Sequence, residues 1–355
     1  MSNLDSYWQL PEHEILNSLD WDLNTFYGDE DRGKLTIGPS FGQGYTLYSI
    51  ESFVHDVLSS SEAGFVVNKI RPRKWVFSEL CLSKHFYRMA DYLSIENPHL
   101  LYSEYVEVFL KSCREVGAQT HNFYRPEEII SEGVCSADLF NKLLDEIREK
   151  ARSPEVRRRR SSRISHANRV AKSNIQYVDA LFGKYSRLLV LRVDFSYKKE
   201  HTGNVGLNDI KKDMERLFNN TRSNSIFSAK VGSIWKIEYG HKKGYHFHAI
   251  FFFDGAKVRS DAYLANRIGN YWQEVITEGK GWHYNCNRHK GKYMQCGIGM
   301  VSHSDSRMIE ALYKAVIYLA KAEQYVMVKE ARNQRVRGRG VMPKTRSSSR
   351  GRPRR

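Results

Sequence analysis

Hydrophobic residues recur at spacings of three and four through much of residues 1–160, which is the pattern of amphipathic helices. The pattern is clearest in the segments EHEILNSLDWDL, ESFVHDVL, SKHFYRMADYL and ADLFNKLLDEIREKA. None of these segments contains a motif that we can connect to chemistry. Residues 1–160 therefore predict a mostly helical, acidic N-terminal region whose role the pattern does not indicate.

The pattern changes after residue 160, where apolar runs typical of strands alternate with helical periodicity. The expected strands are 188–197, 233–240, 245–255 and 293–301, and the expected helices are 206–222, 259–277 and 305–329. This order, β-α-β-β-α-β followed by a helix, predicts an α+β domain with a ferredoxin-like split β-α-β antiparallel sheet and a C-terminal helix. We expect two helices on one face of the sheet and an open opposite face that holds a site.

Two basic segments mark the expected limits of this domain. The segment RSPEVRRRRSSR at 152–163 breaks the helical pattern, and we interpret it as a solvated linker or as a contact for a DNA backbone. From residue 333 onward the chain combines Arg, Gly, Ser and Pro with almost no apolar residues, which predicts disorder and nonspecific contact with nucleic acid. The expected units are therefore 1–160, 161–330 and a disordered basic tail at 331–355.

Charge separates the two halves of the chain. Lys and Arg number 14 against 24 Asp and Glu in residues 1–150, and 42 against 16 in residues 151–355, which together give the net charge of +16. Cationic surfaces bind nucleic acids by releasing condensed counterions, so the second half predicts a nucleic-acid partner. No long apolar run, lipidation motif or secretory signal appears, and the five cysteines are scattered, so we expect a cytoplasmic protein without a membrane partner or disulfide framework.

Two histidines lie two residues apart in the expected strand GYHFHAIFFF. His246 and His248 therefore project from the same face of the sheet, and paired imidazoles are a metal-ligand geometry. If the hairpin from 238 to 246 closes symmetrically about Lys242, Glu238 lies directly across from His246 and shares its face. Two imidazoles and a carboxylate would then converge and leave coordination positions open for a substrate oxygen. A register slip of one residue would move Glu238 to the wrong face.

The last expected helix offers candidates for a nucleophile in ALYKAVIYLAKAEQYV. Helical geometry groups Lys314, Tyr318, Lys321 and Tyr325 on one face beside the apolar stripe, with Tyr313 on its opposite flank. A cation three residues from a phenol can lower the phenol pKa or stabilise charge on an attacked phosphate. The alternative interpretation of Tyr318 is a half-buried aromatic residue of an amphipathic helix.

The segment WHYNCNRHKGKYM adds a basic, aromatic loop. His283, Cys286, His289 and Cys296 lie close enough in sequence for a zinc site, but their spacing matches no zinc motif, and stacking with a single strand is the better interpretation. Basic residues in this loop, in the HKKG turn and on the last helix are the DNA-binding candidates: Lys242, Lys243, Arg288, Lys290, Lys292 and Lys314.

GYHFH followed at a distance by YLAK resembles the HUH endonucleases, which combine a His-hydrophobic-His strand with a Tyr-x-x-Lys helix on a ferredoxin-like sheet. More closely, LLVLRVDFSY, WKIEYGHKKGYHFHAIFFFDG, GIGMV, YLAKAEQYV and the terminal GRPR are similar to inovirus-type replication proteins of filamentous phages and prophages, with a YfjJ-like C-terminal domain. The resemblance covers residues from about 165 to 355. Each motif is weak alone, and their shared order and spacing carry the resemblance.

The resemblance implies an enzyme of rolling-circle replication that nicks single-stranded DNA at an origin hairpin. His246, His248 and Glu238 would hold Mg²⁺ or Mn²⁺, and Tyr318, assisted by Lys321, would form a 5′-phosphotyrosine link and release a 3′-hydroxyl that primes synthesis. Asp194 matches the family's first motif in position, where it shapes the metal site or contacts DNA. The host partners would be a helicase and a polymerase of a bacterial or phage-infected cell.

Several alternatives remain open at this point. Some relatives carry two active tyrosines, so Tyr313 or Tyr325 is a candidate for a second one. A noncatalytic DNA-binding protein of replication or regulation would bind through the same basic domain without forming a covalent adduct. Relaxases and transposases share the chemistry and differ in their DNA substrate.

Overall fold

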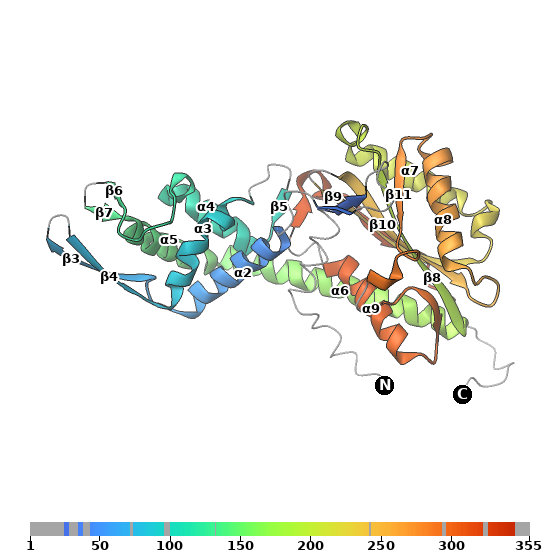
Figure 1. The fold of residues 1–355 in the computed structure, drawn as a ribbon. Coiled ribbons are helices and arrows are strands. Elements are labelled where there is room, and N and C mark those ends of the chain that lie inside the picture. Colours follow the sequence, from blue (N-terminus) through green and yellow to red (C-terminus); the bar gives the residue numbers. More distant parts are fainter. Residues whose placement is uncertain are drawn as a thin grey trace.

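The sheet that carries the two histidines is built around β10 (Gly244–Asp254), which pairs with β8 (Arg187–Tyr197) on one side and β9 (Lys230–Gly240) on the other. We describe it from a computed structural model (Figure 1). The model describes residues 25–27, 35–37, 43–71, 74–95, 100–131, 133–240, 243–292, 296–321 and 326–344.

The sheet has the strand order β11-β8-β10-β9-β14, and β12 also pairs with β8. Every pair in it is antiparallel. The outer strands are β11 (Gly281–Asn285), β12 (Gly299–Ser302) and β14 (Arg337–Arg339). With the helices around it, the sheet makes the protein a mixed α+β structure, as the sequence predicts. The strand expected at 293–301 begins only at Gly299, and β11 forms where the sequence indicated a loop.

One face of the sheet packs on two helices, as expected. Phe247, Phe251 and Phe253 of β10 share a core with apolar residues of α7 (Leu207–Asn220) and α8 (Asp261–Tyr271). The helix α8 continues as a π-helical turn, η6, to Ile276. Because side chains alternate along a strand, these odd-numbered residues leave the even-numbered ones for the opposite face.

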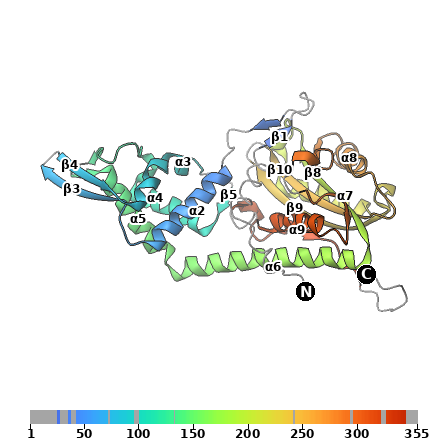
Figure 2. The same cartoon turned by 60° about the horizontal axis from the view of Figure 1, so that its bottom comes forward.

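The opposite face is not open, which corrects the sequence-based expectation. Ile250 and Phe252 of β10 are fully buried in a core that includes residues of α6 (Pro154–Lys184) and α9 (Ser306–Lys321). The two helices lie side by side beneath the sheet (Figure 2). A strand that is buried on both faces reads as a continuous apolar run, which explains the sequence AIFFF.

The N-terminal region is mostly helical, as predicted. Its helices pack around an aromatic core of Phe53, Phe109 and Phe140, and two short hairpins extend from its far end (Figure 1). Its elements are α2 (Gln43–Ser59), β3 (Phe65–Arg71), β4 (Lys74–Glu79), η2 (Cys81–Arg88), α3 (Met89–Leu93), α4 (Glu104–Val116), η3 (Ala118–Thr120), β6 (Ile129–Ser131), β7 (Val134–Cys135) and α5 (Ser136–Ala151). Two further pairs are β1 (Thr25–Tyr27) with β2 (Leu35–Ile37), and β5 (Leu100–Tyr102) with β13 (Val326–Val328).

The basic run at 152–163 forms the start of α6 instead of a linker, and the expected boundary at 160/161 falls inside this helix. The helix begins where the Ser153 hydroxyl accepts a hydrogen bond from the Val156 amide, and Pro154 occupies its first turn. Arg159 pairs with a carboxylate of α4 (Glu107). Acidic residues of the first half therefore hold part of the basic run, and α6 connects both halves as one helix (Figure 2). Within the described segments, no helix is both long and apolar enough to cross a bilayer.

The expectation of disorder from residue 331 is wrong for the part that is described. Arg337–Arg339 form β14 on the outer edge of β9, and the carbonyl of buried Val336 accepts a 2.7 Å hydrogen bond from the Ile237 amide. Arginine stems and guanidinium planes provide the packing here: Arg335 lies over the ring of Trp235, and Arg339 over that of Tyr177. Residues 345–355 lie outside the described part of the chain.

The packing of α6 and α9 on the second face of the sheet predicts how a substitution there changes stability. Phe252→Ala removes a fully buried ring between the sheet and helices α6 and α9, so it should lower the free energy of unfolding by about 3–5 kcal/mol in urea titrations. The control is Tyr263→Ala on α8, whose side chain is 67% exposed and which should change stability by less than about 0.5 kcal/mol. Equal effects of the two substitutions would contradict the burial of this face.

Candidate metal centre

The hairpin of β9 and β10 has the register that the sequence predicts. His246 lies directly opposite Glu238, and His248 lies opposite Lys236. Opposite residues of an antiparallel pair share a face, so Glu238 projects on the same side of the sheet as both histidines. His246 and His248 are fully buried, and Glu238 is 6% exposed. Lys242, on which the symmetric closure was based, lies outside the described residues.

Three donor groups converge on one point between these strands. Glu238 Oε2 lies 3.3 Å from His248 Nε2 and 3.9 Å from His246 Nε2. One ligand atom from each residue lies within 4.8 Å of the others, and this is the only group of its kind among the described residues. The spacing is that of ligands around one ion, in which each donor sits about 2 Å from the centre.

Hydrogen bonds to the other ring nitrogens set the tautomers of both imidazoles. His246 Nδ1 lies 3.1 Å from the carbonyl oxygen of Gly244, which can only accept, so Nδ1 carries the proton. His248 Nδ1 lies 2.8 Å from Asp194 Oδ1, and the carboxylate likewise accepts from it. Both Nε2 atoms therefore face Glu238, that of His246 with a lone pair and that of His248 at hydrogen-bond distance from Oε2. A carboxylate behind a histidine, fixing its tautomer and orientation, is the arrangement seen behind metal-binding imidazoles.

Two buried cations that sequence reasoning missed balance the two carboxylates. Lys236 forms an ion pair with Glu238 Oε1, which leaves Oε2 to face the imidazoles. Arg192 pairs with Asp194 at 3.1 Å. The signal was present, because each cation stands two residues before its carboxylate and so shares its face. Sequence reasoning considered the histidine spacing and the acidic residues only.

Burial and charge act in opposite directions on the acidic groups. Burial alone raises the pKa of Glu238, but the Lys236 ammonium and the hydrogen bond from His248 outweigh it and hold this pKa well below its ordinary value. The pKa of Asp194 is also low, because Arg192 and His248 outweigh its burial. Burial lowers the pKa of His246 well below its usual range, so this imidazole is neutral at neutral pH. Both carboxylates are therefore ionised, and His246 keeps its lone pair.

The donor set fits a divalent metal ion. His246 Nε2 is buried and has no hydrogen-bond partner among the described residues, so its lone pair lacks the interaction that a buried nitrogen requires. A cation at the centre of the group would satisfy this lone pair and that of His248 together. Two imidazoles and one carboxylate suit transition metals such as Mn²⁺ better than Mg²⁺, which favours oxygen ligands only.

The candidate nucleophiles occupy different environments on α9. Tyr318 is 6% exposed. It belongs to the apolar core that α6 and α9 form with the sheet, on the same face as the histidines. Tyr313 donates a hydrogen bond to Asp179 of α6. Lys321 ends α9, and its side chain lies outside the described part of the structure, as does all of Tyr325. The burial of Tyr318 agrees with the alternative interpretation of this residue as an aromatic side chain of an amphipathic helix, because residues 316–320 of α9 are all buried.

The basic DNA-binding candidates have mixed surroundings. Lys290 pairs with Asp261 at 2.6 Å, Lys314 pairs with Glu310 at 3.6 Å, and Arg288 is exposed. Lys243 lies in the turn before β10 and is partly exposed. The side chain of Lys292 lies outside the described residues.

The structure does not gather the alternative zinc ligands. His283 hydrogen-bonds Gln273, and Cys286 Sγ lies 3.5 Å from Asp194 Oδ2 in the core. The rings of His289 and Tyr284 stack with 5.1 Å between their centroids. Cys296 contacts the carbonyl of Ile298. Each candidate ligand thus has a different neighbour.

Comparison with known proteins gives one match. The model of the YagK/YfjJ C-terminal domain family matches residues 157–335, a span that begins in α6 and ends just before β14. No curated protein and no solved structure matches the chain. The matched span contains the whole candidate metal centre.

Removal of either imidazole tests the centre directly. His246→Ala or His248→Ala should weaken Mn²⁺ binding at least tenfold in isothermal titration calorimetry, because each removes one of three ligands. In the unaltered protein, Mn²⁺ at 100 times its Kd should add about 2.7 kcal/mol of stability. His303→Ala, an exposed histidine outside the group, is the matched control. Identical binding by all three variants would exclude this centre.

Lys236 provides a second test, because it shares Glu238 with the proposed ion. Lys236→Met leaves a buried carboxylate without its cation and should cost about 3–5 kcal/mol of stability in metal-free buffer. Mn²⁺ should then raise the melting temperature more in this variant than in the unaltered protein, since both carboxylate oxygens become available. Lys212→Met on exposed α7 surface serves as the control. A smaller metal response in Lys236→Met would argue against coordination by Glu238.

Proposed function

The chain belongs to the YagK/YfjJ C-terminal domain family, and we propose that it is an HUH-type tyrosine endonuclease that nicks single-stranded DNA at a replication origin. The observation that carries this proposal is the convergence of His246, His248 and Glu238, with the unsatisfied lone pair of His246 at its centre. Within this proposal the protein is an inovirus-type initiator of rolling-circle replication. Its partners are an origin hairpin and the host helicase and polymerase.

The strand order supports a ferredoxin-like assignment for the sheet. Strand β10 lies between β8 and β9, the two strands that α7 connects, so the β-α-β unit is split by a third strand. Strand β11 follows α8 and pairs on the other side of β8. The four strands of the repeat thus follow the order 4-1-3-2, with β12 and β14 as additions.

The metal proposed for the site is Mn²⁺ or Mg²⁺, held by His246, His248 and Glu238. When bound, it would supply Lewis-acid stabilisation of negative charge on a scissile phosphate. Asp194 and Gly244 orient the imidazoles by accepting their Nδ1 protons. Lys236 keeps Glu238 ionised, and Arg192 does the same for Asp194.

In the proposed reaction Tyr318 is the nucleophile. Its phenol loses a proton, the oxygen forms a bond to phosphorus, and the bond from phosphorus to the 3′ oxygen breaks. The departing 3′ oxygen takes up a proton and becomes the hydroxyl that primes synthesis, while the 5′ phosphate remains on the tyrosine. The reverse reaction rejoins strands. Lys321 would stabilise charge on the phosphate from its place three residues further along the helix.

The burial of Tyr318 adds a requirement to this mechanism. Tyr318 lies in the last turn of α9, which ends at Lys321, so its hydroxyl must become exposed before it can reach a phosphate, and opening of this helix end is one route. Helix ends open at much lower free energy than the core of a domain. DNA binding would provide the free energy for this step.

The same burial favours a second candidate function, noncatalytic binding of DNA by a replication or regulatory protein. A structural network of buried polar groups would also contain a phenol in the core. It would likewise contain carboxylates whose charge is neutralised by Lys236 and Arg192. Relaxases and transposases of the same chemistry differ from the first proposal in their DNA substrate only. The chemistry itself is therefore the first point to test.

Tyr318→Phe should abolish nicking and leave DNA affinity within about twofold, because only the attacking oxygen is removed. The assay uses an origin-derived single strand with Mn²⁺ and a denaturing gel. A label at the 3′ end should appear in a covalent adduct with the protein, and a label at the 5′ end should appear in a free fragment that a polymerase extends. Tyr313→Phe, whose hydroxyl contacts Asp179, is the matched control and should nick normally.

Three outcomes decide between the candidates. Loss of the adduct in Tyr318→Phe alone supports the proposed nucleophile. An adduct that maps to Tyr313 or Tyr325 keeps the enzyme class and reassigns the nucleophile. Tight binding of a verified origin without any adduct, with or without Mn²⁺, would sink the endonuclease proposal in favour of the noncatalytic one.

A further inference from the structure

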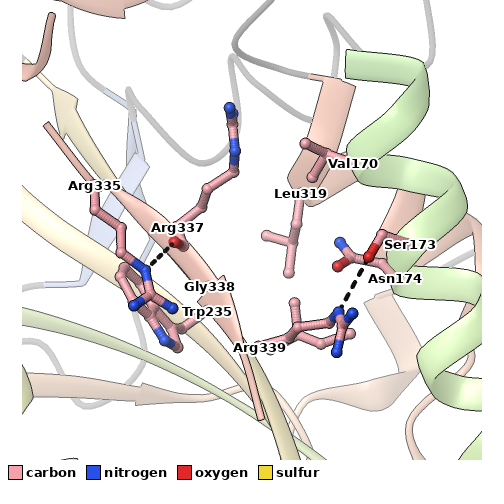
Figure 3. A pocket seen from close by; sticks show the side chains of 10 residues that line it. Val170, Ser173, Asn174, Trp235, Leu319, Arg335, Arg337, Gly338 and Arg339 are labelled. Carbon is pink, nitrogen blue, oxygen red and sulfur yellow. Dashed lines mark hydrogen bonds between the residues drawn. The ribbon is translucent and has the colours of Figure 1, made fainter. Parts of the chain in front are cut away.

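A cavity of about 360 Å³ opens between the edge of the sheet and the two helices beneath it. Strands β9 and β14 form one side, and α6 and α9 form the other (Figure 3). Its lining combines three arginines with aliphatic side chains: Arg335, Arg337, Arg339, Val170, Ile234 and Leu319. The volume is that of a small-molecule site, and the combination of fixed cations with apolar surface is suited to an amphipathic anion.

The arginines reach the cavity with their side chains held in place. Arg339 donates from Nε to the Ser173 hydroxyl at 3.1 Å and from Nη1 to the carbonyl of Gly340. Arg335 donates from Nε to the carbonyl of Arg337 and stacks on Trp235 (Figure 3). Each of these guanidinium groups has further N–H donors beyond these bonds.

Arg335 and Arg339 bring positive charge to this cavity. Neither Arg335 nor Arg339 forms an ion pair with a carboxylate in the described part of the chain, and their bonds above go to neutral acceptors. Arg337 also lines the cavity, where it contacts His166 Nε2 and where burial lowers the pKa of its guanidinium. An anion can accept hydrogen bonds from the further N–H donors of Arg335 and Arg339, and arginine favours phosphate because its planar fork matches phosphate oxygens.

Arg337, which lines the cavity at the edge of the sheet, lies on the same face of the sheet as the metal centre. Arg337 is the cross-strand partner of Lys236, which is in turn the partner of His248. Opposite residues share a face, so this row runs from Arg337 to the histidines. The row crosses two strand spacings, which is roughly 10 Å. One strand of DNA is long enough to occupy both places.

We infer that this cavity binds one nucleotide of the single strand, with its phosphate on Arg335 and Arg339 and its base or sugar against Val170, Ile234 and Leu319. The inference rests on the proposed function and extends it, because it names a subsite beside the nicking centre. The arginines belong to the basic C-terminal part of the chain. In this proposal that part forms a defined binding site and does not act only through nonspecific electrostatic attraction.

The test measures binding of a fluorescent oligothymidylate by anisotropy in EDTA, over a series of salt concentrations. Arg339→Gln should weaken binding about tenfold, because it removes a charged hydrogen-bond donor. It should also reduce the slope of log K against log salt by about 0.7, the value for one phosphate contact on a single strand. Arg267→Gln is the matched control, since Arg267 is an exposed arginine of α8 on the opposite face of the sheet.

Arg335→Gln keeps the test decisive if Arg339→Gln fails to fold, because Arg335 is exposed. It should show the same loss of slope. Affinities and slopes equal to those of Arg267→Gln in both folded variants would overturn the inference.

Two further measurements distinguish an anion that belongs to a DNA strand from a free phosphate or nucleotide. Thymidine 5′-monophosphate and inorganic phosphate are added in thermal-unfolding assays of the unaltered protein and of Arg335→Gln. Arginine-dependent stabilisation by either ion, with an oligonucleotide slope that does not change, would mean that the cavity takes a free anion and not the strand. Because these measurements need neither metal nor Tyr318, they give the same result even if the unaltered protein does not nick DNA, and the two proposals fail separately.

Discussion

The sheet face that α6 and α9 cover has a polar half, and this half depends on one buried row of side chains whose charges alternate in sign. Lys236 bonds Glu238, Glu238 faces His248, His248 donates to Asp194, and Asp194 pairs with Arg192. Each charge would be very costly to bury alone, so each member makes the burial of the next one possible. The row spans β9, β10 and β8 and therefore ties the register of three strands to one pattern of charge.

That row also explains why the sheet face divides into two kinds of surface. Toward one end of the strands, Val190, Ile234, Ile250 and Phe252 provide an apolar floor on which α6 and α9 pack. Toward the other end, the same alternation places ions and imidazoles. The apolar half brings α9, and with it Tyr318, to the face that carries the histidines. The apolar contacts with the helices and the candidate metal ligands therefore lie next to each other, because both are formed by the side chains that project from the same face of the same strands.

The parts that could be predicted from sequence are those governed by local periodicity. Spacing of two along a strand and the symmetry of a short hairpin were enough to bring His246, His248 and Glu238 together. The helices covering the second face could not be predicted, because the pattern of α6 indicates an apolar stripe without saying which surface it meets. The sequence did not reveal that the arginine-rich segment is ordered. Its composition indicates only high charge and few apolar residues, whereas contacts such as the stacking of Arg335 on Trp235 hold the segment in place.

The position of β14 has a consequence for solubility. Without it, β9 would be the outermost strand of a long, twisted sheet and would offer a row of unpaired amides and carbonyls to any other chain. The arginines of β14 cover that row and replace it with a short, strongly cationic border that repels a second copy of itself. A clipped protein lacking these few residues would therefore be prone to self-association through strand addition, even though its core would be unchanged.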